Sequence, residues 1–373
     1  MEVRKKILLC SVLAEAIYKS RRELINDLLI EGFEVIMVAP EEKSEIPVEI
    51  ITNDSIRYYQ IDLQRTGINP FKDISTIKQI KDIIRKEDPS HTYAFGGAKA
   101  AIYTSLGAAK ENVNNNYCMI NGLGSIYRGK GIKNRVTKEI MSILFKRALK
   151  KSKGVLFQNK EDEQEFIMNN LVKEDKTYIV NGSGVNLELF PYSELKNHTN
   201  FLFVGRLLKD KGIYEYIEAA KIIKKSYPDI KFSVVGGFDD NPTGVKQYEI
   251  EKWVEEGIIT FYGKQKNVLP FYQECTAFVL PSYHEGTPRT SLEAMGVGRA
   301  IITTDAPGCR ETVIDKKNGY LVPVKNVAAL VEKIEKIIKF PEIAESMGYE
   351  SYKLAEKKYE VHRVNESILK FIT

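Results

Sequence analysis

The sequence lacks several features that would assign a protein to a class at once. Its 373 residues include one tryptophan, four histidines without metal-ligand spacing, and four scattered cysteines: Cys10, Cys118, Cys275 and Cys309. We therefore expect reduced thiols in a cytoplasmic protein and no metal site built from these residues. No run reaches the ~18–20 apolar residues that a membrane span needs. The short apolar run after Lys6 reads as a first strand, not as a secretory signal.

A strong charge of one sign is also missing. The chain has 55 basic and 50 acidic residues, a net charge of +5, which is too mild to indicate nucleic acid. Hydrophobic residues make up 43% and charged residues 28%, as in soluble globular proteins. The chain is too long for one ordinary core, so we expect two domains.

Short apolar runs alternate with amphipathic stretches, which is typical of βαβ units with parallel sheets. Each half offers about six strands, enough for one doubly wound α/β domain. The periodicity breaks between Asn181 and Asn200. Helices are expected at Ile74–Arg85 and Val136–Leu149. The expected strands are Lys6–Ser11, Glu34–Val38, Ile56–Ile61, Thr92–Phe95, Tyr117–Ile120, Gly154–Gln158, Phe201–Val204, Phe232–Val235, Ile259–Tyr262, Phe278–Leu280, Ala300–Thr303 and Tyr320–Val322.

The most informative stretch holds two glutamates, Glu285 and Glu293, just after the expected strand Phe278–Leu280. Pro288 is expected as the first residue of a helix, with Thr287 as its cap. The N–H groups at a helix N-terminus can bind an anion. A carboxylate further along the helix can accept hydrogen bonds from the hydroxyls of a ribose.

A second constellation follows the first expected strand of the second half. Gly205 ends that strand, and Arg206 and Lys211 lie five residues apart across a loop. Two cations near a helix N-terminus suit a diphosphate. Taken alone, the segment could equally be a solvated basic loop.

Together, the segments Gly205–Gly212 and Glu285–Glu293 resemble those of the retaining glycosyltransferases of family 4, and the linker Asn181–Phe190 is similar to the one between that family's domains. The resemblance implies the GT-B fold, with two facing Rossmann-like domains and parallel sheets. Residues 1–185 would bind the acceptor and residues 190–354 the nucleotide-sugar. The tail, about residues 355–373, would pack back on the first domain.

The resemblance also assigns roles. Arg206, Lys211 and Glu285 would be catalytic, the two cations neutralising the departing nucleoside diphosphate and Glu285 lying near the donor sugar. Glu293 would hold the ribose. The other donor-binding residues would be Gly205, Gly236, Gly237, Lys264, Gly286, Thr287, Pro288 and Arg289.

The first half resembles, more narrowly, bacterial enzymes that extend undecaprenyl-diphosphate-linked sugars, among them the α-1,3-N-acetylgalactosaminyltransferases of N-glycan assembly. The resemblance rests on residues 65–71 and 121–127. It places Asn121, Gly122 and Gly124 near the acceptor or donor sugar. Many family members have a histidine where this chain has Asn121. The pair Asn121-Gly122 could also be a simple turn.

The mechanism that the resemblance implies retains the anomeric configuration and needs no metal and no cofactor. An oxocarbenium-like state would form as the diphosphate leaves, and electrostatic stabilisation of that leaving group would be the main contribution of the protein. The acidic pair Asp239-Asp240 resembles a metal-holding motif of other glycosyltransferases, but we interpret it as a surface turn.

Residues 128–153 contain ten Lys or Arg and one acidic residue, Glu139. Apolar residues recur there at helical spacing, so the segment can lie on an anionic membrane surface. The alternative is a helix that packs on the core and exposes a solvated basic side. Few aromatic residues are interleaved with the charges, which argues against nucleic acid as a partner.

These observations favour a cytoplasmic glycosyltransferase peripheral to the inner face of the plasma membrane. We expect it to move a hexose or N-acetylhexosamine from a nucleoside-diphosphate sugar, with UDP favoured, to a lipid-linked or oligosaccharide acceptor. Two alternatives stay open: a UDP-sugar 2-epimerase with the same fold, and an inactive partner that binds nucleotide or lipid.

Overall fold

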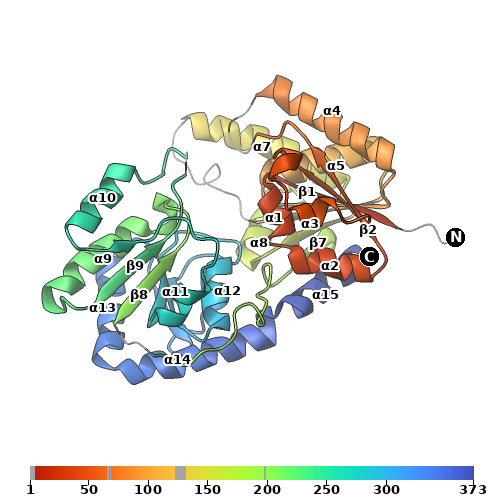
Figure 1. Cartoon of the computed structure of the whole chain (residues 1–373). Coiled ribbons are helices and arrows are strands. Elements are labelled where there is room, and N and C mark those ends of the chain that lie inside the picture. Colours follow the sequence, from red (N-terminus) through yellow and green to blue (C-terminus); the bar gives the residue numbers. More distant parts are fainter. Residues whose placement is uncertain (1–4, 65–66, 68, 122–131, 197–198, 240) are drawn as a thin grey trace. The chain divides into compact units, whose positions relative to one another are not determined.

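The computed structural model describes all residues except 1–4, 65–66, 68, 122–131, 197–198 and 240, and leaves out the side chains of 132–134 and 136. Two compact units divide the chain (Figure 1). The first comprises Met1–Val180 together with Asn365–Thr373, and the second comprises Asn181–Val364.

The first unit is built on a parallel sheet with strand order β3-β2-β1-β4-β5-β6-β7. Helices α4, α5 and α7 pack side by side in that order. The strands are β1 (Lys6–Ser11), β2 (Glu34–Ala39), β3 (Ile56–Gln60), β4 (His91–Phe95), β5 (Asn115–Ile120), β6 (Gly154–Phe157) and β7 (Thr177–Ile179). The helices are α1 (Ala14–Tyr18), α2 (Arg22–Ile30), α3 (Val48–Ile51), α4 (Pro70–Glu87), α5 (Ala98–Lys110), α7 (Ile132–Lys150) and α8 (Lys160–Met168).

The second unit repeats this plan with the strand order β10-β9-β8-β11-β12-β13, again parallel. Its strands are β8 (Asn200–Val204), β9 (Lys231–Val235), β10 (Thr260–Phe261), β11 (Ala277–Leu280), β12 (Ala300–Thr304) and β13 (Gly319–Val322). Its helices are α9 (Ile213–Ser226), α10 (Gln247–Glu255), α11 (Leu269–Glu274), α12 (Arg289–Gly296), α13 (Val327–Lys339) and α14 (Pro341–Leu354). The 3₁₀ turn η3 (Lys209–Lys211) precedes α9, and α15 (Val361–Ile372) ends the chain.

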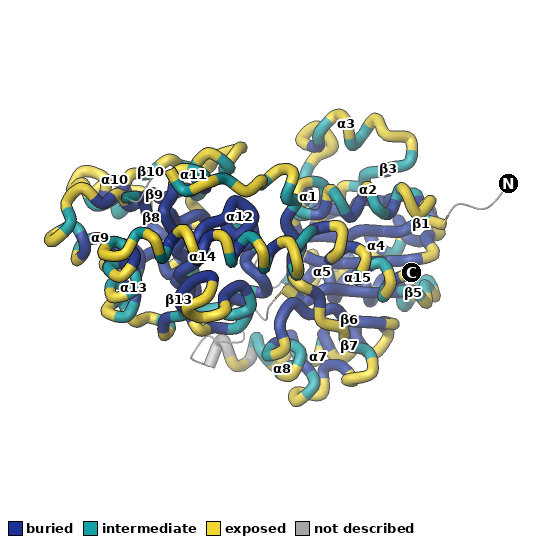
Figure 2. Tube along the Cα trace, turned by 90° about the horizontal axis from the view of Figure 1, so that it is seen from below, coloured by how far each residue is buried: buried dark blue, intermediate teal, exposed yellow. Residues whose placement is uncertain are grey.

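Each unit has its own hydrophobic core between its sheet and helices. The central strands are buried on both sides, and the outer helices expose one face (Figure 2). Such strands read as continuous apolar runs, and for this reason the sequence predicted them within one or two residues. It missed β7, whose Tyr178 and Ile179 are 36% and 39% exposed.

The last residues of the chain pack within the first unit. Asn365 donates from Nδ2 to Asp27 Oδ2 at 2.7 Å. The Phe371 ring stacks on Tyr178 with the ring centroids 4.8 Å apart, and lies edge-on to Tyr117 at 5.7 Å. These contacts explain why residues 365–373 belong to this unit although they follow the second unit in sequence.

A buried arginine ties together the turns of the second unit. Arg299 is 1% exposed, and burial lowers the pKa of its guanidinium. The guanidinium donates to the carbonyl oxygens of Tyr272 (2.8 Å), Gln273 (2.9 Å), Ser193 (2.8 Å), Val297 (3.2 Å) and Gly298 (3.1 Å), and to Ser193 Oγ (2.7 Å). These acceptors come from the end of α11, the turn after α12 and the segment at Ser193, so one side chain satisfies groups that burial would otherwise leave unpaired.

We predict that Arg299→Met lowers the free energy of unfolding by about 3–5 kcal/mol, because several buried carbonyl oxygens lose their donors. Denaturant unfolding measures the change. The matched control is Arg85→Met. Arg85 pairs with Glu111 at 2.8 Å but its side chain is 60% exposed, so little change is expected there. Similar losses in the two variants would contradict the prediction.

Candidate active site

The candidate residues of the second unit gather where the strand order of its sheet reverses. Strand β8 lies between β9 and β11 in the sheet. From β8 the chain proceeds to β9 on one side, and from β11 it proceeds to β12 on the other side. Ligands of open α/β sheets bind at the carboxyl ends of the strands at such a point. Gly205 and Arg206 directly follow β8, and Glu285 follows β11. The expected site thus lies where the topology favours one.

Lys211 and Glu285 are brought together there. The Lys211 ammonium forms an ion pair with Glu285 Oε1, and the two side chains are 22% and 11% exposed. Ser282 donates from Oγ to the same oxygen at 2.9 Å. This pairing holds the ammonium at the carboxyl end of β11 and leaves it further N–H donors, since an ammonium has three.

A glycine makes this approach possible. Gly212 has φ +76°, and a Cβ atom there would lie 2.1 Å from the carbonyl oxygen of Pro281. The residue also serves as the N-cap of α9. The N-terminus of α9, with its partial positive charge, is therefore pressed against the end of β11 beside Lys211.

Arg206 pairs with a different carboxylate. Its Nη1 lies 2.8 Å from Asp239 Oδ2, and the side chains are 52% and 4% exposed. The other oxygen of Asp239 accepts from Asn241 N at 3.0 Å. Asp239 lies in the irregular segment after β9, and its carboxylate is buried against Arg206 and does not face solvent. Asp240 lies outside the described residues.

The loops after β8 and β9 are joined by backbone hydrogen bonds. Leu207 N donates to Gly237 O at 3.1 Å, and Val245 N donates to Leu207 O at 3.0 Å. A Cβ atom at Gly236 would lie 1.8 Å from Gly205 O. The nearest neighbour of Gly237 is the side chain of Lys264, 3.6 Å from its ideal Cβ position. These predicted donor-binding residues therefore adjoin one another.

The helix that carries Glu293 begins one residue later than predicted. α12 starts at Arg289, with Pro288 as its N-cap and no side-chain cap. Pro288 has an extended backbone with ψ 111°, and its carbonyl oxygen accepts from Ser291 N at 3.0 Å and Leu292 N at 3.2 Å. The prediction of Pro288 as first helical residue with Thr287 as cap was wrong, because the extended ψ keeps Pro288 outside the first turn.

Both oxygens of Glu293 have protein partners. Tyr272 donates its hydroxyl to Oε2 at 3.0 Å, and Arg289 donates from Nε to Oε1 at 2.9 Å. Burial, and then the Glu293 charge, raises the pKa of Tyr272 well above its usual value, so the phenol stays a donor. The Glu293 carboxylate is thereby held in one orientation. Sequence reasoning missed Tyr272, which comes from α11.

Residues after β12 pack against the backbone of the Glu285 segment. Glu285 N donates to Pro307 O at 3.0 Å. Gly308 has φ +76°, and a Cβ atom there would lie 2.1 Å from Gly286 O and 2.2 Å from Glu285 O. Sequence reasoning missed Gly308, although the pair Pro307-Gly308 is a turn signal.

The cysteines take no part in this chemistry. All four are buried and unpaired with one another. Burial raises the pKa of each thiol to about 12, and the Glu285 charge adds to this effect at Cys309. At neutral pH they are thiols and not nucleophilic thiolates.

In the first unit, Asn121 lies beside the point where the strand order reverses between β1 and β4. It follows β5, and its Oδ1 accepts from Gly96 N, just after β4, at 3.1 Å. A Cβ atom at Gly96 would lie 2.4 Å from Ser11 Oγ, so the ends of β1, β4 and β5 are close. Gly122 and Gly124 lie outside the described residues.

Two family models match the chain. One, glycosyl transferase 4-like, matches residues 6–159, and the other, glycosyl transferases group 1, matches residues 188–354. The chain belongs to these glycosyltransferases. The two matched ranges fall in the first and second unit respectively, and the second contains every predicted donor-binding residue.

Two bacterial proteins are similar to this glycosyltransferase over most of their lengths. One is an N,N'-diacetylbacillosaminyl-diphospho-undecaprenol alpha-1,3-N-acetylgalactosaminyltransferase of Campylobacter jejuni. This chain is 26% identical to it, and the match covers 87% of this chain and 86% of that protein. The chain is likewise 26% identical to the capsular polysaccharide biosynthesis glycosyltransferase CapM of Staphylococcus aureus, over 85% of this chain and 87% of that one.

Solved structures share the fold. Sucrose-phosphate synthase from Thermosynechococcus elongatus aligns with a TM-score of 0.79 at 21% identity, over 98% of both chains. Anabaena HepE in complex with UDP and glucose aligns with a TM-score of 0.78 at 15% identity, over 99% of both. The glycosyltransferase therefore has the GT-B fold.

The basic segment of the glycosyltransferase includes α7. The buried face of α7 is formed by Met141, Phe145, Ala148 and Leu149. Ile140 and Ile143, two of the apolar residues that recur at helical spacing, are 41% and 52% exposed. Lys146 and Arg147 are exposed as well, so α7 presents apolar and basic side chains together. Among the described residues, no helix is long and apolar enough to cross a membrane.

We predict that Gly308→Ala destabilises the enzyme more than Gly257→Ala. Both glycines have positive φ, +76° and +68°, so an alanine costs about 1–2 kcal/mol of strain at either position. Only at Gly308 does the new methyl group meet backbone, whereas nothing lies within 4 Å at Gly257. Thermal unfolding of the two variants compares them. Equal losses would show that the segment at Glu285 is free to move aside.

Proposed function

We propose that this enzyme transfers a hexose or N-acetylhexosamine, with retention, from a UDP-sugar to a lipid-linked or oligosaccharide acceptor. The pathway would assemble a bacterial surface polysaccharide or glycan. The observation that carries the proposal is the Lys211–Glu285 ion pair at the strand-order reversal of the second unit. A paired cation and anion at such an edge suit the leaving group and the sugar of a donor.

The second unit would hold the donor. Lys211, the exposed Arg206 and the N-terminus of α9 supply positive charge for a diphosphate. Glu293, oriented by Tyr272 and Arg289, would accept hydrogen bonds from the ribose hydroxyls. The HepE structures that share this fold contain UDP or UDP-glucose, which supports uridine as the base.

The proposed transfer can be written as a balanced reaction that uses no metal and no cofactor. The bond between the anomeric carbon and the diphosphate oxygen breaks, and the acceptor oxygen bonds to the same carbon from the same face. The acceptor proton passes to a diphosphate oxygen. Lys211 and Arg206 stabilise the charge that develops on the diphosphate. Glu285, which keeps Lys211 in place, would lie beside the oxocarbenium-like sugar.

The first unit would hold the acceptor. Asn121 is fixed by Gly96 at the carboxyl ends of the strands, where an amide can bind a sugar hydroxyl but cannot take up a proton at neutral pH. The name of the Campylobacter relative specifies a diphospho-undecaprenol acceptor, which supports a lipid-linked acceptor here.

We further propose that the enzyme works at the cytoplasmic surface of the plasma membrane. The exposed Ile140 and Ile143 lie on α7 beside Lys146 and Arg147. Apolar side chains can enter the interface while basic ones bind anionic lipid. Residues 128–153 would thus bring the active site to an acceptor embedded in lipid.

Two other functions can be separated by experiment. A UDP-sugar 2-epimerase would convert its substrate without any acceptor, so a test for epimerisation in the absence of acceptor distinguishes it. An inactive nucleotide-binding or lipid-binding partner would bind UDP but transfer nothing. A donor screen that detects released nucleoside diphosphate, with a short polyprenyl-diphosphate sugar as acceptor, addresses both.

We predict that Lys211→Ala or Glu285→Ala lowers kcat/KM at least ~100-fold, because each removes a charge that acts in the transition state. The matched control is Lys209→Ala, an exposed lysine of the same turn η3, which should keep near-normal activity. Circular dichroism checks the fold, and calorimetry with UDP separates binding from chemistry. Near-normal turnover in both variants, or no heat from UDP with the wild-type enzyme, would refute the assignment.

We predict that reversing two charges on α7, in the double variant Lys146→Glu/Arg147→Glu, weakens binding to anionic liposomes at least ~10-fold, since each basic residue near the surface contributes about 1 kcal/mol. The control is Lys224→Glu/Lys225→Glu, the same change at the end of α9 in the second unit. Sedimentation with liposomes at low and high salt measures binding. Wild-type protein that stays in solution at low salt, or equal effects of both variants, would contradict the proposal.

A further inference from the structure

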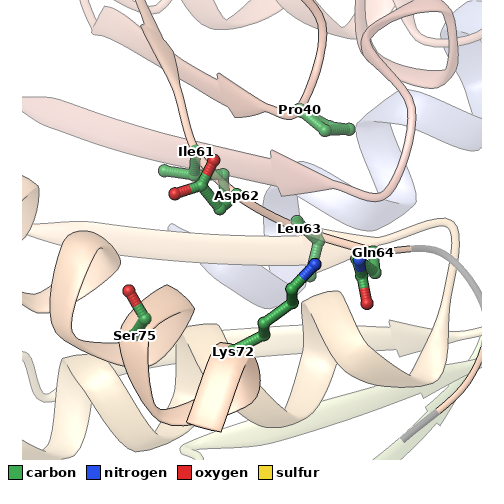
Figure 3. Close-up of a pocket in the computed structure, with 7 residues that line it drawn as sticks. All are labelled: Pro40, Ile61, Asp62, Leu63, Gln64, Lys72 and Ser75. Carbon is green, nitrogen blue, oxygen red and sulfur yellow. The ribbon is translucent and has the colours of Figure 1, made fainter. Parts of the chain in front are cut away.

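The first unit contains a cavity of about 460 Å³ that none of the roles above uses. It lies between the segment after β3 and the first turns of α4 (Figure 3). Pro40, after β2, closes one side. The lining residues are Pro40, Ile61, Asp62, Leu63, Gln64, Lys72 and Ser75.

The walls of this cavity are held by specific hydrogen bonds. Gln79 of α4 accepts from Asp62 N at 2.8 Å and donates to Asp62 Oδ2 at 2.7 Å. Thr76 donates to Asp62 O at 2.5 Å. α4 itself is capped by Asn69, whose Oδ1 accepts from Lys72 N at 3.2 Å. The strand end and the helix are therefore fixed to each other, and the cavity is formed without a ligand.

Four polar groups line the cavity above an apolar floor. The Asp62 carboxylate, the Gln64 amide, the Lys72 ammonium and the Ser75 hydroxyl all belong to its lining (Figure 3). Within the part of the chain that the structure describes, Asp62 Oδ1 and the side chains of the other three residues have no hydrogen-bond partner. Ile61 and Leu63, 3% and 4% exposed, form the floor together with Pro40.

The described lining has one positive and one negative side chain, Lys72 and Asp62. This balance favours a neutral ligand over a diphosphate. A diphosphate needs an excess of cations or free N–H groups. The described lining has one ammonium and one carboxylate, and Asn69 already caps the helix. A sugar ring is neutral, carries several hydroxyl groups, and has an apolar C–H face. A carboxylate, an amide and a hydroxyl are suitable partners for its hydroxyls, and the volume lies in the range of small-ligand pockets.

We propose that this cavity binds a sugar residue of the acceptor, remote from the residue that is glycosylated. The inference rests on the proposed function. Parallel strands place the cavity, after β2 and β3, at the same sheet edge as Asn121, after β5. With the strand order β3-β2-β1-β4-β5 and ~4.8 Å between strands, the separation is about 14–19 Å. The acceptor therefore carries more than one sugar residue.

Binding energy from a remote sugar should appear in the kinetics of long acceptors. Such energy positions the reacting hydroxyl and is lost when the substrate is truncated. The test compares a short polyprenyl diphosphate that carries one N-acetylhexosamine with one that carries three. The variants are Asp62→Asn, which removes the charge, and Ser75→Phe, which fills the cavity. Asp82→Asn and Lys78→Phe are controls at other exposed positions of α4.

We expect each cavity variant to lower kcat/KM for the three-sugar acceptor by about 10-fold, the effect of losing one or two hydrogen bonds, mainly through KM. Transfer to the one-sugar acceptor and the affinity for UDP should stay within about twofold. The proposal is overturned if both acceptors lose equally, if neither loses, or if wild-type enzyme prefers the one-sugar acceptor.

A second measurement tests the cavity independently of catalysis. Saturation-transfer NMR with chitotriose and maltotriose should detect binding of at least one of them to the wild-type protein and not to Ser75→Phe. The proposal fails if neither saccharide binds but inorganic diphosphate binds to the wild-type protein and not to Ser75→Phe. The cavity would then be an anion site. If UDP does not bind but a saccharide does, the proposed function fails and the cavity stands.

Discussion

The parallel pairing of β8 with β11 is the constraint on which the candidate active site depends. It joins Phe201 to Ala277 and Leu202 to Phe278, residues about 76 positions apart, and so sets the loop after β8 beside the loop after β11. Because Gly212 has no side chain, the backbone at the start of α9 can approach the backbone at Pro281 closely. Lys211 therefore lies near enough to Glu285 to form an ion pair. The charges of the site are therefore placed by sheet geometry, and their own attraction only fixes the final orientation.

The two units use the same device for different ends. In each, the sheet reverses its strand order once, and a glycine directly follows one of the two strands at that point, Gly96 after β4 and Gly205 after β8. In the second unit this edge concentrates charge, with Lys211, Arg206 and two glutamates. In the first unit it offers Asn121 and a charge-balanced cavity near β3. This division suits a charged donor on one unit and a neutral saccharide on the other, as the proposed reaction requires.

The sequence predicted the framework better than the contacts. Strands buried on both faces can be recognised in the sequence as continuous apolar runs. Strand β7 is short and half-exposed, so its sequence contains no such run. Glu285 and Lys211 could be predicted to share a sheet edge because each follows an expected strand. That Arg206 turns to Asp239 could not, since it depends on how the loop after β9 folds over the loop after β8. Tyr272, Ser282 and Gly308 act through contacts made only in the folded chain, and the start of α12 depends on a backbone angle that local capping rules do not fix.

The buried state of the four cysteines has a practical consequence. Because every native thiol is inaccessible and protonated at neutral pH, a maleimide would leave the folded enzyme unmodified. A single cysteine introduced on an exposed helix face could then be labelled with a fluorophore without first removing the natural ones. Pairs of such labels, one on each unit, would allow the separation of the two halves of the enzyme to be followed in solution as donor and acceptor are added.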